Sequence, residues 1–287
     1  MNVFLNGSIM PHHEALIPVT DRGFLFADGV YEVVRIYGGR TAFFAEHMAR
    51  LRRGLAELRI DPSAADGVEA IAGALIADNG LADQDGIVYA QVTRGAPPNR
   101  SHAFPPDTPP TVYTVAQPHP RPSNERFDAG VAATLVQDTR WKRRDIKSIA
   151  LLPNVLANQE AHDRGAFEAL FVEDGHVLEG SRSNLFAVHG GALLTHPLTS
   201  EILPGITRAA VVRVARESGM EVREAPIPLE LLDAVSELFL TGTTTEVMPV
   251  VRVDGRAVGG GVPGPVAGAL QEAYLRYALN PGHETDR

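Results

Sequence analysis

The chain has 287 residues, no cysteine and a formal net charge of −9. This length suffices for a full core and favours two domains, since one domain typically takes about 100–200 residues. The charge argues against a nucleic-acid partner, and the missing thiols exclude disulfides, thiolate metal sites and a cysteine nucleophile. No apolar run approaches the roughly 18 residues of a membrane span, and no signal core opens the sequence. We therefore expect a cytoplasmic protein without a membrane or metal partner.

The N-terminal part alternates strand signals, glycine turns and helical periodicity. β-branched and aromatic residues predict strands, and apolar residues at three- and four-residue steps predict helices. The expected strands are Val3–Leu5, Val30–Tyr37, Arg40–Phe43, Ile87–Thr93 and Thr111–Ala116, and the expected helices are Phe44–Leu58 and Val68–Asp78. The proline-rich stretch Pro97–Pro110 cannot form a regular element and is a candidate binding loop.

The repeated prolines between Pro118 and Asn124 predict an extended linker. We therefore expect a small N-terminal domain over 1–117, a linker over 118–124 and a larger C-terminal domain over 125–287. The expected C-terminal strands are Val131–Val136, Glu168–Val172, Leu185–Val188, Glu237–Thr241 and Val247–Val253, and the helices are Asn154–Arg164, one opening at Thr207, and Val266–Ala278. Mixed helices, strands and hairpin turns favour an α+β fold.

Two charged residues could serve a cofactor that carries an amino group. Such a site needs a lysine to form an imine and an acid to bind the ring nitrogen of the cofactor. Lys147 is the candidate lysine, and Glu179, just after Val177-Leu178, is the candidate acid. Taken alone, each is better explained as a solvated surface charge, because lysine and glutamate side chains are mostly exposed.

An anion pocket for a phosphate has three candidate sources. Pro204–Arg208 resembles a loop that opens a helix at Thr207, where free N–H groups and the helix dipole favour an anion. The loop Gly242–Thr245 offers hydroxyl groups, and Arg50 offers a guanidinium on an otherwise apolar helix face. An ordinary helix cap, a common turn and a side chain reaching along the surface are the alternative explanations.

A clamp for a substrate carboxylate is suggested by Arg100 and His102 inside the proline-rich loop. A guanidinium and an imidazole two residues apart could hold a carboxylate together. Tyr31 could add a phenol hydroxyl, although an aromatic residue in a strand more often packs in the core. Solvent-exposed Arg and His side chains are the alternative for the loop pair.

Taken together, these segments resemble the fold-type IV pyridoxal phosphate enzymes, and within them the D-amino-acid aminotransferases, along nearly the whole chain. The matching segments are Asp21–Arg35, Glu46-His47 through Arg50-Leu51, Gln91–Gly95, Arg100 with His102, Asp145–Ser148, Glu179–Ser181, Ser183-Asn184, Leu203, Gly205–Arg208, Thr243-Thr244 and Glu246.

The resemblance implies a two-domain enzyme whose active site lies at the domain and subunit interface. Lys147, in the C-terminal domain, would form the aldimine with pyridoxal 5'-phosphate, and Glu179 would bind the pyridine nitrogen. The other residues implied at the cofactor are Arg50, Ser183, Asn184, Leu203, Gly205, Ile206, Thr207, Thr243 and Thr244. Tyr31, Arg100 and His102 would bind the substrate carboxylate, with the last two reaching the neighbouring subunit of a homodimer.

The activity that the resemblance implies is transfer of an amino group from a D-amino acid, such as D-alanine, to a 2-oxo acid, such as 2-oxoglutarate. Four alternatives stay open: a branched-chain L-amino-acid aminotransferase, an aminodeoxychorismate-lyase-like enzyme, an (R)-amine transaminase, and a noncatalytic pyridoxal phosphate carrier. One departure from the family pattern is Arg182, where a small residue is usual. It leaves the geometry of the turn after Glu179 in question.

Overall fold

The computed structural model describes residues 1–280, and the chain divides into two units. Unit 1 comprises Met1–Pro120 and Ile146–Ala150, and unit 2 comprises Arg121–Asp145 and the chain from Leu151 onward. The division after Pro120 falls inside the segment 118–124 that was expected to be a linker. Residues 281–287 of the expected C-terminal domain lie outside the described residues.

The placement of Lys147 differs from the sequence interpretation, which put this residue in the C-terminal domain. Its short segment belongs to unit 1, although the chain on both sides of the segment belongs to unit 2. Backbone hydrogen bonds explain the grouping: the Tyr31 amide donates to the Lys147 carbonyl at 3.1 Å, and the Ile149 amide donates to the Gly29 carbonyl at 3.1 Å.

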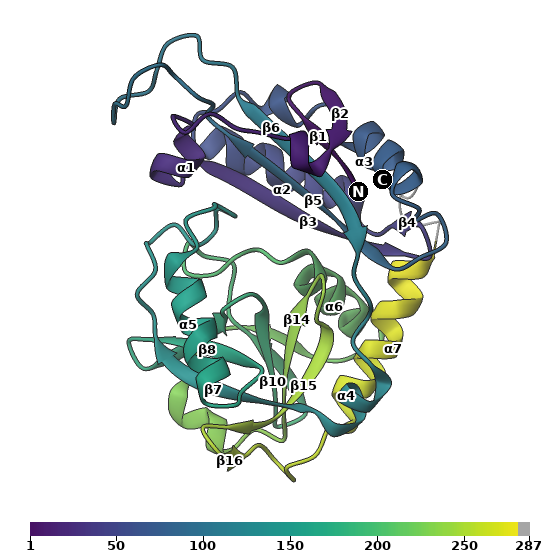
Figure 1. The fold of residues 1–287 in the computed structure, drawn as a ribbon. Coiled ribbons are helices and arrows are strands. Elements are labelled where there is room, and N and C mark those ends of the chain that lie inside the picture. Colours follow the sequence, from purple (N-terminus) through teal and green to yellow (C-terminus); the bar gives the residue numbers. More distant parts are fainter. Residues whose placement is uncertain (281–287) are drawn as a thin grey trace. The chain divides into compact units, whose positions relative to one another are not determined.

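Unit 1 is an antiparallel sheet with strand order β2-β1-β6-β5-β3-β4, packed against two helices (Figure 1). Its elements are β1 Asn2–Leu5, β2 Ser8–Pro11, α1 Arg22–Phe26, β3 Gly29–Tyr37, β4 Arg40–Thr41, α2 Phe44–Glu57, α3 Val68–Asp78, β5 Gly86–Thr93 and β6 Thr111–Pro118, with 3-10 turns at His12–Glu14 and Pro62–Ala65. Met48, Leu51 and Leu55 of α2 are buried against the sheet, as their spacing predicted. The loop from Arg94 to Pro110 contains no strand or helix.

Unit 2 is built on one large mixed sheet. Its elements are α4 Asn124–Ala129, β7 Val131–Gln137, α5 Leu152–Asp163, β8 Glu168–Glu173, β9 His176–Gly180, β10 Asn184–His189, β11 Ala192–Thr195, α6 Ile206–Glu217, β12 Val222–Glu224, β13 Ile227–Pro228, β14 Glu237–Gly242, β15 Glu246–Val253, β16 Arg256–Ala257 and α7 Pro265–Leu279, with a 3-10 turn at Leu229–Asp233. The strand order is β12-β11-β10-β14-β15-β7-β8-β9-β13. β9 also pairs with β10, with Glu179 opposite Asn184. This pairing closes the strands β10, β14, β15, β7, β8 and β9 into a ring.

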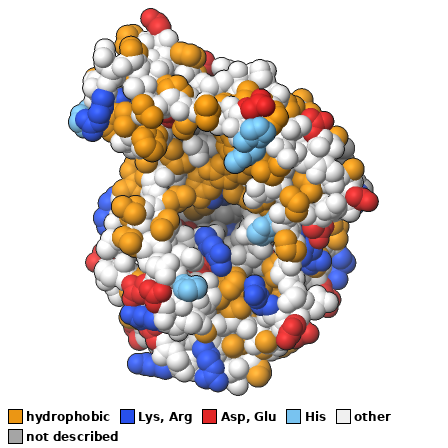
Figure 2. Space-filling model, in the orientation of Figure 1, with side chains coloured by type: hydrophobic (Ala, Val, Ile, Leu, Met, Phe, Trp, Pro, Cys, Tyr) orange, Lys and Arg blue, Asp and Glu red, His pale blue; other side chains and the backbone are white. Residues whose placement is uncertain are grey.

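The sequence prediction missed the short elements and β9, which carries Glu179. The predicted return strand Arg40–Phe43 ends at Thr41, because Phe43 takes a left-handed conformation with φ 56° directly before α2. None of the helices within residues 1–280 is long and apolar enough to cross a membrane. On the face seen in Figure 2, basic side chains are interspersed with acidic ones on both units.

Candidate active site

Lys147 lies beside Tyr31 in unit 1. Ser148 forms a β-bridge with Val30, which holds the Lys147 segment against the start of β3. The Lys147 Nζ atom is 3.4 Å from the Tyr31 hydroxyl oxygen and 4.4 Å from the centre of the Tyr31 ring. The structure therefore brings together two residues that were predicted from segments more than a hundred positions apart.

A buried ionic group lies on the opposite face of β3. The Arg50 guanidinium donates two hydrogen bonds to the Glu32 carboxylate, at 2.6 and 2.8 Å, and the His47 Nδ1 atom is 2.7 Å from the same carboxylate. Glu32 is fully buried, and Arg50 and His47 are nearly so. The predicted Arg50 is thus paired with Glu32, which also binds His47, and the sequence interpretation gave neither Glu32 nor His47 a role.

Burial and neighbouring charges both shift the pKa values of Glu32 and His47. Burial alone would raise the pKa of Glu32, but the Arg50 guanidinium and His47 lower it well below its ordinary range. Burial lowers the pKa of His47, Glu32 opposes that change, and the charges of Arg50 and Lys147 lower it further. Near neutral pH the group is therefore a carboxylate, a guanidinium and a neutral imidazole. A guanidinium presents five N–H donors, so Arg50 can bind both Glu32 and an external anion.

The predicted clamp residues lie in the exposed loop between β5 and β6. The Arg100 guanidinium is stacked on the Phe26 ring, 4.6 Å from its centre, and the His102 ring centre is 5.3 Å from that of Phe26. Arg100 and His102 therefore both contact the Phe26 ring, and both remain exposed to solvent.

Glu179 in unit 2 is held by three donors. Its carboxylate accepts hydrogen bonds from the Arg140 guanidinium at 2.6 Å, the Asn184 side-chain amide at 3.0 Å and the Leu203 backbone amide at 3.1 Å. Asn184 also donates to the Leu203 carbonyl at 2.9 Å. Three predicted residues, Glu179, Asn184 and Leu203, are thus brought into direct contact.

Arg140 is a partner of Glu179 that the sequence interpretation missed. Its guanidinium also binds Asp138 and lies 4.0 Å from the centre of the Phe171 ring. Burial raises the pKa of the Glu179 carboxyl, and the charge of Arg140 opposes that rise. An arginine in a basic stretch normally suggests a solvated side chain, so the sequence held no local signal for a buried ion pair.

The start of α6 lies next to this carboxylate. Gly205 precedes the helix, and no side chain caps the amide groups of its first turn. A Cβ atom at Gly205 would lie only 2.0 Å from the Asn184 side-chain oxygen, so only glycine fits there. Thr207 is buried in the first turn. Uncapped amides at a helix start, next to a threonine hydroxyl, form a suitable site for an anion.

The remaining predicted residues lie on neighbouring strand ends. Asn184 pairs with Thr241 across β10 and β14, and the turn holding Thr243 and Thr244 follows β14 directly. The Thr241 hydroxyl is buried and has no hydrogen-bond partner among the described residues. Ser183 donates to Glu168 at 2.8 Å and does not bond Glu179 directly.

Arg182 leaves the turn after Glu179 intact. Its backbone amide donates to the buried Glu168 carboxylate at 2.8 Å, and its guanidinium is within 3.4 Å of the same group and stacks on the Phe167 ring. Across the turn, the Gly180 amide donates to the Ser183 carbonyl at 2.8 Å. The departure from the family pattern is therefore accommodated by a buried counter-charge.

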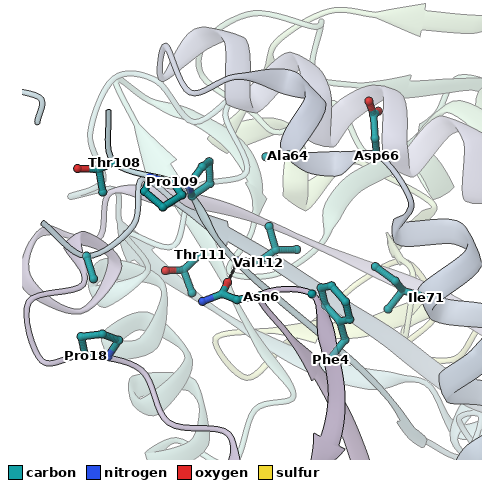
Figure 3. Close-up of a pocket in the computed structure, with 13 residues that line it drawn as sticks. Phe4, Asn6, Pro18, Ala64, Asp66, Ile71, Thr108, Pro109, Thr111 and Val112 are labelled. Atoms are coloured by element: carbon teal, nitrogen blue, oxygen red, sulfur yellow. Dashed lines mark hydrogen bonds between the residues drawn. The ribbon is translucent and has the colours of Figure 1, made fainter. Parts of the chain in front are cut away.

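A pocket of about 510 Å³ lies elsewhere in unit 1 (Figure 3). Its lining includes Phe4, Ile71 and Val112, with the Asn6 side chain accepting a hydrogen bond from the Val112 amide at 2.9 Å. None of the predicted site residues lines it. Its polar groups do not include the lysine, the arginines or the glutamate described above, so it does not define the candidate site.

Comparison with known proteins places this geometry in a family. The sequence model of the class IV amino-transferases matches residues 29–253. D-alanine aminotransferase of Bacillus licheniformis is 40% identical over 286 residues, covering 99% of this chain and 100% of the relative. The D-alanine aminotransferase of Staphylococcus haemolyticus is 37% identical over 277 residues, covering 96% of this chain and 97% of the relative.

Solved structures agree with the sequence comparison on the fold. The branched-chain amino acid aminotransferase of Escherichia coli superposes with a TM-score of 0.89 at 28% identity, covering 96% of this chain and 94% of that one. The corresponding enzyme of Thermoproteus uzoniensis, solved with norvaline, gives a TM-score of 0.85 at 27% identity, covering 99% and 96%. A further branched-chain enzyme, solved with pyridoxamine 5'-phosphate, gives 0.88 at 28% identity, with the same coverage of 99% and 96%. The chain therefore belongs to the class IV amino-transferase family. The expected fold-type IV architecture is confirmed.

We expect Glu32→Gln to lower the free energy of unfolding by about 3–5 kcal/mol at pH 7, because Arg50 would stay buried without a counter-charge. The folded-state pKa of Glu32 lies below its ordinary value of 4.5, so its contribution is complete above that pH and is lost as the pH falls. Urea denaturation from pH 7 down to pH 3 should show a shrinking difference between the free energies of unfolding of the wild type and the variant. The exposed Glu69→Gln is the control, and a difference that grows at low pH would contradict the prediction.

Proposed function

We propose that this protein transfers an amino group from a D-amino acid, such as D-alanine, to a 2-oxo acid, such as 2-oxoglutarate, with pyridoxal phosphate as cofactor. The observation that carries the proposal is the 40% identity to a D-alanine aminotransferase over 99% of the chain. The branched-chain aminotransferase structures share this fold at 28% identity.

The donor set in unit 2 suits two parts of this cofactor. A carboxyl group held by Arg140 can bind a ring nitrogen of the cofactor, which is the role proposed for Glu179. The uncapped start of α6, with Ile206 and Thr207, and the turn with Thr243 and Thr244 suit a phosphate. The Thr241 hydroxyl, on the residue opposite Asn184, has no hydrogen-bond partner among the described residues. A bound group could supply that partner.

Unit 1 supplies the amine and a further anion contact. Lys147 offers its amino group beside the Tyr31 hydroxyl, and Arg50, oriented by Glu32, offers a guanidinium for the phosphate. Held by these residues, pyridoxal phosphate would supply the carrier for the amino group in a ping-pong reaction between the donor and the 2-oxo acid. Lys147 then moves the proton at the substrate α-carbon, acting as general base and general acid.

Arg100 and His102 set the orientation of the substrate in this proposal. A fixed carboxylate leaves the α-hydrogen of only one enantiomer facing Lys147, so the clamp decides which enantiomer reacts, which in this proposal is the D-amino acid. The exposed position of the loop supports the expectation that both residues serve the active site of a partner subunit in a homodimer.

The main rival is a branched-chain L-amino-acid aminotransferase, the activity named for the Escherichia coli enzyme that shares this fold at 28% identity. A panel of paired D- and L-amino acids, followed through the absorbance change of the bound cofactor, separates the two. Reaction with D-alanine but not with L-leucine supports the proposal. The opposite preference would establish the rival, and reaction with (R)-amines alone would establish an amine transaminase.

Lys147→Ala should lower the rate of D-alanine transamination by at least about 10²–10⁴-fold, the usual worth of a general acid–base group. Borohydride should no longer attach the cofactor to the chain. The assay is pyruvate formation from D-alanine and 2-oxoglutarate. Lys142→Ala, whose exposed side chain binds Glu173, is the matched control and should keep full activity. Substantial transamination by the Lys147 variant would refute the mechanism.

Arg100→Ala should raise the KM for D-alanine by about 10–100-fold, which corresponds to the loss of one charged hydrogen bond. Cofactor affinity should not change, because Arg100 is assigned to the substrate only. Steady-state kinetics and fluorescence titration with pyridoxal phosphate measure the two quantities. Arg40→Ala removes an exposed guanidinium elsewhere in unit 1 and is the control. An unchanged KM would show that the carboxylate assignment is wrong.

Arg140→Met removes the cation that opposes the effect of burial on Glu179, so the pKa of this carboxyl should rise further. The acid side of the pH profile for the D-alanine half-reaction should then move upward by about 1–3 units. Rates measured from pH 5 to pH 9 test this shift. Arg143→Met, which alters a half-exposed pair with Asp145, is the control. A lower rate at every pH, with no shift of the profile along the pH axis, would mean that Arg140 does not control the pKa of Glu179.

A further inference from the structure

The segment Asp21–Asp28 holds the clamp loop, Arg94–Pro110, at both of its ends. The Asp21 carboxylate is fully buried and accepts hydrogen bonds from the Thr93 hydroxyl at 3.0 Å and the Thr111 hydroxyl at 2.7 Å. Thr93 ends β5 and Thr111 begins β6, so one side chain ties together the two points where the loop leaves the sheet.

Arg22 holds the middle of the same loop. Its guanidinium is buried and donates hydrogen bonds to the backbone carbonyls of Ser101, His102 and Ala103, the latter two at 3.4 Å. A loop without secondary structure leaves its carbonyls in need of donors, and a single guanidinium with five N–H groups satisfies several at once. These carbonyls belong to His102 itself and to its two neighbours, so Arg22 fixes the backbone that carries the clamp.

Phe26 holds the clamp side chains. Its ring contacts the guanidinium of Arg100 at 4.6 Å and the ring of His102 at 5.3 Å, and the guanidinium of Arg22 lies 4.7 Å from its centre. Exposed arginine side chains occupy many rotamers, and restricting them before the substrate arrives lowers the entropy lost on binding.

Asp28 connects the segment Asp21–Asp28 to the rest of unit 1. Its carboxylate binds Arg22 at 2.8 Å and Arg94 at 2.7 and 2.9 Å, and Arg94 also donates to the Leu58 carbonyl at 2.7 Å. The Arg94 guanidinium is stacked on Phe104 of the loop, 3.6 Å from the ring centre. Burial alone would raise the pKa of Asp28, but the two arginines hold it below its ordinary value. Charged side chains therefore link Arg22, through Asp28 and Arg94, to Leu58 at the end of α2.

We propose that Arg22 and Phe26 are positioning residues for the substrate carboxylate, which act by holding Arg100 and His102 in their binding arrangement. The inference rests on the proposed function. Arg22 acts on the loop backbone, and Phe26 acts on the two side chains. No role follows for either residue in cofactor binding or in proton transfer.

The test is Phe26→Leu, compared with Phe24→Leu on the same helix. Phe24 is 70% exposed, so the same substitution there controls for a change of apolar volume in α1. Phe26→Leu should raise the KM for D-alanine by about 3–10-fold, the scale of a few weak cation–π and ordering contributions, while kcat stays within about 2-fold. Affinity for pyridoxal phosphate should be unchanged. A loss of kcat and cofactor affinity with constant KM would show a general structural role and overturn the inference.

A double-mutant cycle shows whether Phe26 acts through the clamp. In a chain that already carries Arg100→Ala and His102→Ala, Phe26→Leu should have no further effect on the KM for D-alanine. The same increase in both backgrounds would overturn the inference.

Arg22 is tested by Arg22→Lys, which keeps the charge but cannot bind several carbonyls in the fixed geometry of a guanidinium. It should also raise the KM for D-alanine more than it lowers kcat. If this buried variant fails to fold, the Phe26 variants still decide the question.

The outcomes separate this inference from the proposed function. If Arg100→Ala leaves the KM for D-alanine unchanged, the carboxylate assignment itself is wrong. If Arg100→Ala raises the KM but Phe26→Leu does not, the proposed function stands and only the positioning role fails.

Discussion

The alternation of side chains along β3 is the constraint on which the chemistry of unit 1 depends. Tyr31 and Glu32 are neighbours in sequence, so they point to opposite faces of the sheet. Tyr31 meets Lys147 on one face, and Glu32 meets Arg50 and His47 on the other. A shift of register by one residue would place a carboxylate beside the lysine and a phenol beside the buried arginine. The long antiparallel pairing of β3 with β5 prevents that shift.

Compensation of buried charge determines which residues can surround a cofactor. Two of the proposed contacts are buried and have a partner of opposite charge: Arg50 has Glu32, and Glu179 has Arg140, which also binds Asp138. Burial shifts the pKa of an isolated charge toward the neutral form, and a partner of opposite charge opposes that shift. Arg182 follows the same rule, since its guanidinium approaches the buried Glu168. Each of these proposed cofactor contacts therefore forms one electrostatic unit with its buried partner.

The sequence predicted features that depend on local pattern. The three- and four-residue spacing of Met48, Leu51 and Leu55 was sufficient to place α2. Partners that are distant in sequence could not be predicted in this way. Arg140 binds Glu179 across 39 positions, and Arg22 binds Ser101 across 79, and neither pair has a periodic signature. The resemblance to a family supplied the predicted site residues, but not the groups that hold them.

Lys147 illustrates why a residue's neighbours in sequence are a poor guide to its surroundings. Arg144, three residues before it, belongs to unit 2 and binds Glu173 and Asp138, whereas Lys147 is bonded to β3 of unit 1. The strand that fixes Tyr31 therefore fixes the lysine as well, through the bond between the Tyr31 amide and the Lys147 carbonyl. A backbone contact of this kind needs no particular side chain, which is why no motif around Lys147 could reveal it. The backbone positions that carry the amine and the phenol are consequently hydrogen-bonded to each other.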